Sequence, residues 1–281
     1  MMDEKTLKSA EALFELAYAE DIGEGDITTN NLVPPGSGKK AILIAKEEGT
    51  VAGLPVAEMV FKKFDSNIEW NVKLPDGSKV KPGDVIVEFS GSYRALLTGE
   101  RKALNFLQRL SGIATYAAKC MKEVEGFNVE ILDTRKTLPG YRYLDKYAVR
   151  MGGASNHRFG LYDMVMIKDN HIKVAGGIQE AVKAIHSKIP ENIKIEVETT
   201  TPEQVQEAID ANVDIIMLDN MSSKMMKQAV KLINGRAKTE ASGNMTLKRI
   251  RKVAATGVDY ISIGALTHSV KALDISQRII D

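Results

Sequence analysis

The carboxyl-terminal half of the chain carries strand ends at nearly constant spacing, and this spacing constrains the fold more than any other feature. Short apolar or β-branched runs end at Glu198, Asp219, Ser242 and Gly264, which are 21, 23 and 22 residues apart. Helical patterns lie between these runs, and the step matches the length of one strand plus one helix. Repeated units of this kind build a parallel sheet covered by helices.

A parallel sheet either closes as a barrel or stays open and doubly wound. No G-x-G-x-x-G sequence follows the first strand, and polar residues gather at the carboxyl ends of several strands, where barrel enzymes place their catalytic groups. Residues 125–281 number only 157, whereas a complete barrel of eight units takes roughly 200 or more. We therefore expect an irregular, open α/β barrel of about six units.

Apolar periodicity places the individual elements. Strands are expected at 129–133, 164–168, 193–198, 215–219, 239–242 and 260–264, and helices at 178–187, 202–212, 224–233 and 246–256. The amino-terminal part differs, with helices expected at 4–20, 55–64 and 98–124 and short strands with turns between 39 and 90. This smaller α+β or all-β unit is short for a domain that is stable by itself, so we expect it to pack against another part of the protein.

Basic residues concentrate in one stretch of an otherwise balanced chain. Residues 134–173 carry eight Lys or Arg and three acids, while the whole chain has a net charge of +1. A local surplus of this kind indicates a small anionic ligand rather than nucleic acid. Arg135, Lys136 and Lys168 follow strand ends, and His157 with Arg158 lies between them. Because the guanidinium fork of arginine matches carboxylates, the cluster suggests a ligand with more than one carboxylate.

Two acids and two small-residue turns occupy the other strand ends. Glu198 and Asp219 are suited to hold Mg²⁺, although each alone is more often a helix cap or a salt-bridge partner. The alternation in IKIEVE directs Lys194, Glu196 and Glu198 to one face, where unpaired charges would be costly. The turns after residues 242 and 264 expose backbone N–H groups of the kind that bind phosphate, or are ordinary tight turns.

Several classes of function are excluded. A single cysteine, Cys120, excludes an intrachain disulfide framework, and no run approaches the roughly 18 apolar residues of a membrane span. The first residues lack the apolar core of a signal peptide, so we expect a cytoplasmic protein without membrane partners. No Ser-His-Asp or Cys-His arrangement along the sequence suggests a covalent nucleophile. The residues therefore indicate an enzyme that joins a phosphorylated, Mg²⁺-bound substrate to a carboxylate-bearing one by positioning and electrostatics.

Several segments, spread over nearly the whole chain, closely resemble one family of enzymes, the quinolinate phosphoribosyltransferases, also called carboxylating nicotinate-nucleotide pyrophosphorylases. The segments are EDIGEGDITT (20–29), GERKALNFLQRLSGIAT (99–115), DTRKTLPGYR (133–142), GGASNHRFGLYDMVMIKDNH (152–171), IEVE (195–198), MLDNM (217–221), EASGN (240–244) and SIGALTHS (262–269). The resemblance implies a pentosyltransferase that converts quinolinate and phosphoribosyl pyrophosphate to nicotinate mononucleotide, pyrophosphate and CO₂ for NAD synthesis.

The resemblance also implies roles for individual residues. Arg135, His157 and Arg158 are similar to residues that hold the quinolinate carboxylates, and Lys136 and Lys168 to catalytic lysines between the acid and the donor. Glu198 and Asp219 would be catalytic acids that serve the ribose and Mg²⁺, directly or through water. Further substrate-binding positions implied by the same motifs are Thr134, Ser242, Gly243, Asn244, Gly264, Ala265 and His268.

The family further implies an architecture and an assembly. We expect an N-terminal α/β sandwich domain at 1–112 and the α/β-barrel catalytic domain at 113–281, with an extreme C-terminal helix that packs back on the first domain. The family also implies a homodimer, or a hexamer of dimers, in which Arg101 reaches the active site of the neighbouring subunit. Spacing alone would make Arg101 a solvated arginine beside Glu100.

Two other functions are compatible with the pattern. One is a related phosphoribosyltransferase-like protein of molybdenum-transport loci, which shares the fold and acts on another substrate. The retained TRK and HR motifs, at residues 134–136 and 157–158, argue against it. The other is a metabolite-binding protein without catalysis, in which Glu198 and Asp219 would have no role.

Overall fold

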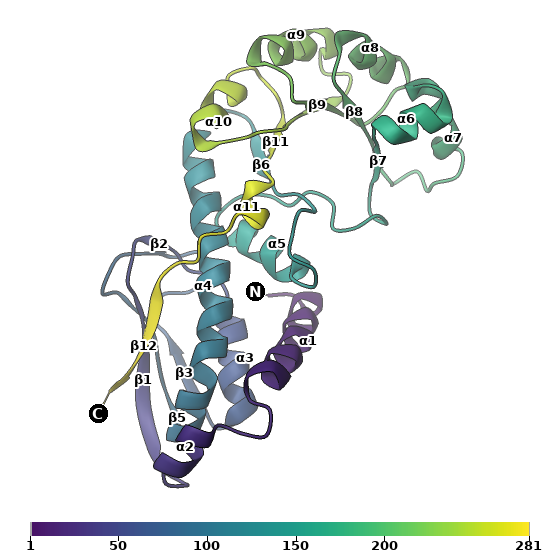
Figure 1. The fold of residues 1–281 in the computed structure, drawn as a ribbon. Coiled ribbons are helices and arrows are strands. Elements are labelled where there is room, and N and C mark those ends of the chain that lie inside the picture. Colours follow the sequence, from purple (N-terminus) through teal and green to yellow (C-terminus); the bar gives the residue numbers. More distant parts are fainter. Residues whose placement is uncertain (1, 281) are drawn as a thin grey trace. The chain divides into compact units, whose positions relative to one another are not determined.

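The computed structural model describes residues 2–280, which fall into two compact units (Figure 1). The first unit comprises Met1–Ala118, Thr137–Gly153 and Leu266–Asp281, and the second comprises Lys119–Lys136 and Ala154–Ala265, in each case within the described residues. The chain thus leaves the second unit after Lys136 and returns to it at Ala154. The expected domain boundary at residue 112 stays a prediction.

The first unit is built on an antiparallel sheet with the order β12-β1-β5-β3. The central strand β1 (Gly38–Ala45) pairs with β5 (Val85–Ser92) on one side and with β12 (Ile275–Ile280) on the other, and β3 (Glu69–Val72) pairs with β5. The remaining elements of this unit's amino-terminal part are α1 (Glu4–Asp21), α2 (Ile27–Leu32), β2 (Gly49–Thr50), α3 (Leu54–Phe64) and β4 (Lys79–Val80). This mixed architecture confirms the expected amino-terminal α/β domain.

Aromatic side chains fill the core between α3 and the sheet. Phe61 of α3 lies with its ring centroid 4.8 Å from that of Phe89 on β5 and 5.9 Å from that of Trp70 on β3. The long helix α4 (Tyr93–Glu123) buries Leu104, Leu107 and further apolar residues at helical spacing. The burial of these rings and leucines removes from water the apolar side chains that the sequence pattern predicted to be internal.

The carboxyl-terminal segment corrects one expectation. Ile275–Ile280 is the strand β12, not a helix, and it pairs antiparallel with β1 from Ala45↔Ile275 to Lys40↔Ile280. The sequence ISQRII is rich in β-branched isoleucine, which favours a pleated strand when an open sheet edge is available. Just before it, Leu273 donates its N–H to the carbonyl of Gln108 on α4 at 2.9 Å.

The second unit is a parallel sheet with the order β6-β11-β10-β9-β8-β7. In residues 2–280 it has six strands, as the spacing predicted, and it is open because β6 and β7 form its two edges. The strands are β6 (Glu130–Leu132), β7 (Val165–Ile167), β8 (Ile195–Thr199), β9 (Ile215–Asp219), β10 (Lys238–Ser242) and β11 (Tyr260–Ser262). An irregular, open α/β barrel is therefore confirmed.

Helices connect the later strands, as Figure 1 shows around the rim of this unit. They are α6 (Asp169–Ala175), α7 (Ile178–His186), α8 (Pro202–Asp210), α9 (Ser223–Ile233) and α10 (Leu247–Ala254). The short helix α11 (Ala265–His268) follows the last strand and belongs, from Leu266 on, to the first unit. Thr201 caps α8 and Ser222 caps α9, since each side-chain oxygen accepts a backbone N–H of the first turn. The four helices expected in the second unit are thus present within two residues of their predicted ends, whereas α4 begins at Tyr93, five residues before its predicted start.

Besides the short helices α2, α6 and α11, one longer helix was not expected. No helix was predicted between β6 and β7, yet Arg142–Met151 forms α5. Its buried face includes Leu144, Tyr147 and Ala148, whose spacing is helical.

No helix among residues 2–280 is long and apolar enough to cross a membrane.

Cys120 is fully buried on α4, and burial raises the pKa of its thiol to about 12. Because the thiolate is the reactive form, the native protein should not react with Ellman's reagent at pH 8, whereas the urea-unfolded protein should release one equivalent. The absorbance of released thionitrobenzoate measures both. Rapid stoichiometric reaction of the native protein would show that this segment is not buried in solution.

Candidate active site

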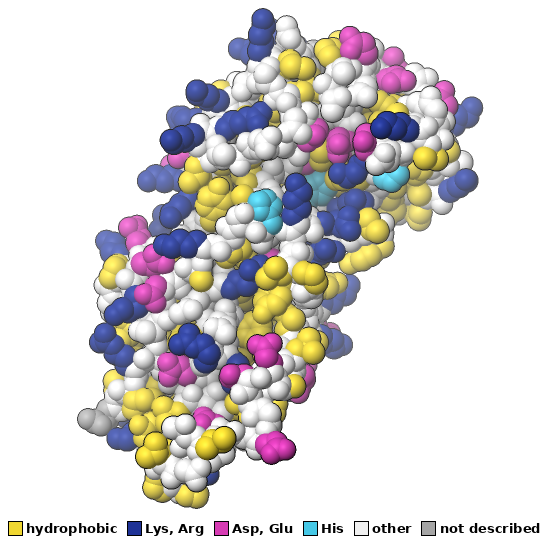
Figure 2. All heavy atoms as spheres, viewed as in Figure 1, with side chains coloured by type: hydrophobic (Ala, Val, Ile, Leu, Met, Phe, Trp, Pro, Cys, Tyr) yellow, Lys and Arg dark blue, Asp and Glu magenta, His cyan; other side chains and the backbone are white. Residues whose placement is uncertain are grey.

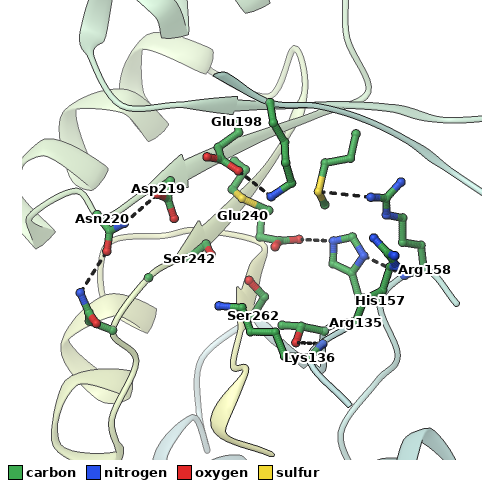
Figure 3. A pocket seen from close by; sticks show the side chains of 16 residues that line it. Arg135, Lys136, His157, Arg158, Glu198, Asp219, Asn220, Glu240, Ser242 and Ser262 are labelled. Carbon is green, nitrogen blue, oxygen red and sulfur yellow. Dashed lines mark hydrogen bonds and ion pairs between the residues drawn. The ribbon is translucent and has the colours of Figure 1, made fainter. Parts of the chain in front are cut away.

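The carboxyl ends of the parallel strands surround a cleft with a volume of about 590 Å³ (Figure 3). Each strand of the second unit, or the turn that follows it, contributes at least one lining residue, as expected where parallel strands end at one edge. The lining residues are Thr134, Arg135, Lys136, His157, Arg158, Met166, Lys168, Glu198, Met217, Asp219, Asn220, Glu240, Ser242, Gly243, Asn244 and Ser262.

Charges of opposite sign occupy different sides of this cleft. Figure 3 shows Arg135 and Arg158 on one side of the cleft, and Glu198 with Asp219 on the other. Lys168 joins the two sides, because its Nζ lies 3.0 Å from Oε2 of Glu198. On the face drawn in Figure 2, by contrast, basic and acidic side chains are interspersed. The cleft thus offers localised positive charge for an anionic group beside carboxylates for a cation.

The guanidinium of Arg158 is held by groups of strand β7 and the residue before it. Its Nη1 donates to the carbonyl of Met164 at 2.8 Å, and its Nη2 contacts Sδ of Met166 at 3.7 Å. Burial lowers the pKa of Arg158, and the nearby charge of Arg135 lowers it further. Two arginines that repel each other at one wall create a site that an anion with two charges would stabilise.

The backbone that carries Arg158 is anchored from beneath by Asp133. This fully buried carboxylate at the end of β6 accepts the N–H of His157 at 2.9 Å and the Nδ2–H of Asn156 at 2.6 Å. Such charge-assisted bonds in a buried place are among the strongest that a side chain makes. The turn from Asn156 to Arg158 is therefore fixed without any ligand.

His157 is the centre of a buried charged group behind the arginines. Its Nε2 lies 3.1 Å from Oε2 of Glu196 and 3.2 Å from Oε2 of Glu240, and both glutamates are fully buried. Burial lowers the pKa of His157, but the contacts with Glu196 and Glu240 raise it more, to about 10. Burial raises the pKa of Glu196 to about 7, against the lowering effect of His157.

The raised pKa of His157 favours a charged ring, whereas the contact at the other ring nitrogen favours a ring with a single hydrogen. The amide of Arg158 donates to Nδ1 of His157 at 2.7 Å, so this nitrogen carries no hydrogen. A doubly protonated ring would lose that bond. The geometry therefore favours a hydrogen on Nε2, the nitrogen that faces the two buried carboxylates.

Two neighbouring turns after β9 and β10 form the floor opposite the arginines. Asn220 and Asn244 adopt left-handed backbone conformations with φ of 53° and 52°, and Gly243 has φ of 91°. The side chains connect the turns, since Asn244 Nδ2 donates to Oδ1 of Asn220 at 3.1 Å and Asn220 Nδ2 donates to Oδ2 of Asp219 at 2.7 Å. A Cβ at Gly243 would collide with Oδ1 of Asn220, so glycine is required here.

Arg249 of α10 holds both turns from behind. Its Nη1 donates to the carbonyl of Gly243 and its Nη2 to the carbonyl of Met221, each at 2.7 Å. A planar guanidinium fixes the separation of two acceptors better than an ammonium does. With these carbonyls bound by Arg249, the turns keep one conformation in which polar backbone is available to an anion.

The structure brings most of the predicted site residues together. Eleven of them line the cleft within the described part of the chain: Thr134, Arg135, Lys136, His157, Arg158, Lys168, Glu198, Asp219, Ser242, Gly243 and Asn244. Gly264 and Ala265 follow β11 and are half-buried, but they are not among the lining residues of the described cleft. Arg101 and His268 are exposed and belong to the first unit.

Some residues of the cleft were not assigned from the sequence. Asn220 and Glu240 line it, and Glu196 lies behind it. The alternation of charges in β8 was a signal for Glu196, whose buried charge needed a partner. Lys194, expected on the same interior face, instead precedes the strand and is exposed. Nothing in the local sequence of β10 marks Glu240 as a neighbour of His157.

The fold and the cleft define an α/β-barrel protein in which arginines, carboxylates and a glycine-containing turn meet at the carboxyl ends of the parallel strands. Sequence comparison identifies the family. The family description "Quinolinate phosphoribosyl transferase, N-terminal domain" matches residues 26–111, and "Quinolinate phosphoribosyl transferase, C-terminal domain" matches residues 113–278. The chain therefore belongs to the quinolinate phosphoribosyltransferase family.

Individual relatives are similar over nearly their whole length. The chain is 46% identical to a probable nicotinate-nucleotide pyrophosphorylase [carboxylating] of Bacillus subtilis, over 93% of this chain and 90% of that one. It is also 46% identical to a mitochondrial quinolinate phosphoribosyltransferase [decarboxylating] of Nicotiana tabacum, over 95% and 81%. The solved structure of the nicotinate-nucleotide pyrophosphorylase from Francisella tularensis is 41% identical, with a TM-score of 0.93 and coverage of 97% and 96%.

Replacing Arg249 with Lys should loosen the turns, because an ammonium cannot hold the two carbonyls with a planar fork. Binding of inorganic pyrophosphate, measured by titration calorimetry, should weaken roughly tenfold. Arg251→Lys is the matched control on the same helix, since Arg251 is exposed and its guanidinium lies 5.4 Å from the ring centroid of Phe127. Equal pyrophosphate affinity in Arg249→Lys and the control would contradict the assigned role of Arg249.

Proposed function

We propose that the protein transfers the phosphoribosyl group of phosphoribosyl pyrophosphate to quinolinate with loss of CO₂, giving nicotinate mononucleotide and pyrophosphate in NAD biosynthesis. Membership of the family and the names of relatives at 46% identity support this activity. The observation that carries the proposal is the convergence of Arg135, Arg158 and Lys168 with Glu198 and Asp219 at one cleft. This arrangement suits a dicarboxylate beside a phosphorylated donor.

The positively charged side of the cleft, formed by Arg135 and Arg158, would hold quinolinate. Arg135 and Arg158 would bind the two quinolinate carboxylates with their guanidinium forks, with Thr134 and His157 beside them. Lys168 pairs with Glu198 at 3.0 Å, so it lies where the acid side meets the donor side. Lys136 follows Arg135 and is exposed at the same cleft, where its charge would neutralise departing pyrophosphate.

The opposite side would hold the donor. The turn of Ser242, Gly243 and Asn244 supports a phosphate site, and by family resemblance so do Gly264, Ala265 and His268. Glu198 and Asp219 fit Mg²⁺, because they are half-buried oxygen donors at the ends of adjacent strands, where they contact the side chains of Lys168 and Asn220. Glu198 and Asp219 would hold Mg²⁺ directly or through water, and the bound ion would supply positive charge to the pyrophosphate group of the donor.

The residues of the cleft act by binding and charge rather than by covalent catalysis. As the bond from ribose C1 to pyrophosphate breaks, the pyridine nitrogen forms the new bond to C1. The carboxylate next to that nitrogen then leaves as CO₂, its electron pair passes to the cationic ring, and the ring carbon takes a proton from solvent. Because the arginines must not stabilise that carboxylate too strongly, their mutual repulsion and the nearby Glu240 suit the reaction.

We further propose a cytoplasmic homodimer, alone or as part of a hexamer, in which Arg101 enters the active site of the other subunit. The exposure of Arg101 on α4 and the family resemblance support this assembly. An Arg101→Ala chain mixed with a chain inactivated at Arg135 would form dimers with one intact site. Sedimentation equilibrium gives the oligomeric state of each protein.

The activity is tested directly with quinolinate labelled at the carboxylate next to nitrogen, phosphoribosyl pyrophosphate and MgCl₂. Labelled CO₂ and nicotinate mononucleotide should appear in equal amounts, and EDTA should stop both until Mg²⁺ is restored. Binding of quinolinate without CO₂ would favour a metabolite-binding protein. Absence of both binding and turnover would favour a relative that acts on another substrate.

Replacing Arg135 with Ala should raise the KM for quinolinate about ten- to a hundredfold, because a charge-assisted hydrogen bond to the acid is lost. The KM for phosphoribosyl pyrophosphate should change little, and steady-state kinetics with each substrate varied in turn measures the difference. Arg278→Ala, at an exposed position of β12, is the control. Unchanged quinolinate kinetics in Arg135→Ala would remove this residue from the acid site.

A further inference from the structure

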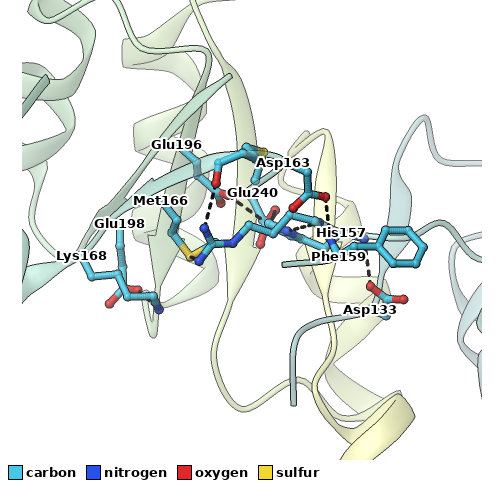
Figure 4. Close-up of polar contacts among 11 residues, drawn as sticks. Asp133, His157, Phe159, Asp163, Met166, Lys168, Glu196, Glu198 and Glu240 are labelled. Carbon is cyan, nitrogen blue, oxygen red and sulfur yellow. Dashed lines mark hydrogen bonds and ion pairs between the residues drawn. The ribbon is translucent and has the colours of Figure 1, made fainter. Parts of the chain in front are cut away.

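The buried group formed by His157, Glu196 and Glu240 has a role that neither the charge of the cleft nor the proposed reaction assigns (Figure 4). The exposed fraction is 9% for His157 and 0% for each glutamate. Among residues 2–280, no well-aligned hydrogen-bond donor reaches either carboxylate, although Nε2 of His157 lies within 3.2 Å of both. Buried carboxylates without donors are costly, so their retention at the cleft needs a reason.

The contacts of the ring determine where its hydrogen lies. Nδ1 accepts the amide hydrogen of Arg158 at 2.7 Å and therefore has none of its own. The hydrogen is then on Nε2, which faces Glu196 and Glu240 at nearly equal distances. Because Nε2 lies within 3.2 Å of an oxygen of each glutamate, the ring cannot turn toward the cleft without leaving both of them.

The same contacts argue against a bound metal ion. The ligand atoms of these side chains all lie within 4.8 Å of one another, as in a metal site. A histidine that binds a metal through Nε2, however, donates the hydrogen of its other nitrogen to an acceptor. In this protein Nδ1 faces a donor, the amide of Arg158, so Nε2 keeps its hydrogen and has no lone pair for a metal.

The position of Arg158 depends on this arrangement. His157 is fixed at its amide by Asp133, at Nδ1 by the amide of Arg158 and at Nε2 by the two glutamates. The guanidinium of Arg158 is fixed in turn by the carbonyl of Met164. The guanidinium of Arg158 is thus in place before any ligand binds, which reduces the entropic cost of binding.

We propose that Glu196 and Glu240 are positioning residues, which hold the ring of His157 through their close approach to its Nε2 and thereby make the ring a rigid support for Arg158. His157 then lies in one fixed orientation beside the acid site. The inference rests on the proposed function only where quinolinate is the ligand measured.

The first test is independent of any activity. The chain has four histidines, and ¹⁵N NMR of the histidine-labelled protein distinguishes protonated from unprotonated ring nitrogens, with His157→Asn used to assign the signal. At neutral pH we expect Nε2 of His157 to be protonated and Nδ1 to be unprotonated. Protonation of Nδ1, or an Nε2 signal that shifts on removal of metal, would overturn the proposal.

The second test uses quinolinate kinetics. Replacing Glu196 and Glu240 together with Ala should raise the KM for quinolinate roughly tenfold and leave the KM for phosphoribosyl pyrophosphate within about twofold. The double Gln variant keeps two acceptors for the Nε2 hydrogen and should recover most of the lost quinolinate affinity. Glu130→Gln, an exposed glutamate at the start of β6, is the control.

The outcomes separate this inference from the proposed function. Equal losses for both substrates, or no recovery by the Gln pair, would show a general structural or charge role and would overturn the positioning role. If the wild-type protein turns over no quinolinate, the proposed function fails, and the NMR signal of His157 still decides the inference. If the Ala pair fails to fold, the Gln pair and the NMR measurement decide it.

Discussion

The parallel pairing of the strands in the second unit is the constraint on which the cleft depends. Because every strand runs in one direction, residues that are distant in the sequence, such as Arg135 after β6 and Asp219 at the end of β9, reach the same edge. The short strands β6 and β7 leave the sheet open between its two edges. The open barrel therefore supplies a rim of polar side chains whose partners come from other strands.

Electrostatics then divides this rim into two halves. The arginines repel each other at one wall, while Glu198 is held near Lys168 at the boundary. The buried acids Glu196 and Glu240 lie behind the positive wall and limit its net charge. A pocket with cations alone would bind a dicarboxylate more tightly, but it would also stabilise the carboxylate that the proposed reaction must release.

The sequence was sufficient for the features that depend on local periodicity and on strand ends. The parallel strands and the convergence of Arg135 with Lys168 follow from spacing, because residues at the ends of parallel strands lie at one edge of the sheet. The pairing of His157 with Glu240 does not follow, since it joins positions 83 apart whose neighbours carry no complementary signal. The strand β12 was missed for the same reason, because its conformation is decided by the free edge of β1.

The residues that were hardest to foresee share one property, which is that they support other residues. Arg249 holds two turns by their carbonyls, and Asp133 holds the backbone before Arg158. A group that contacts a ligand must have a particular chemistry at a strand end, so its type reveals it. A group that holds such a residue needs only a distance and an acceptor or donor, and these arise from the folded chain. The rigidity of the site is therefore a property of the fold, whereas its chemistry is already visible in the sequence.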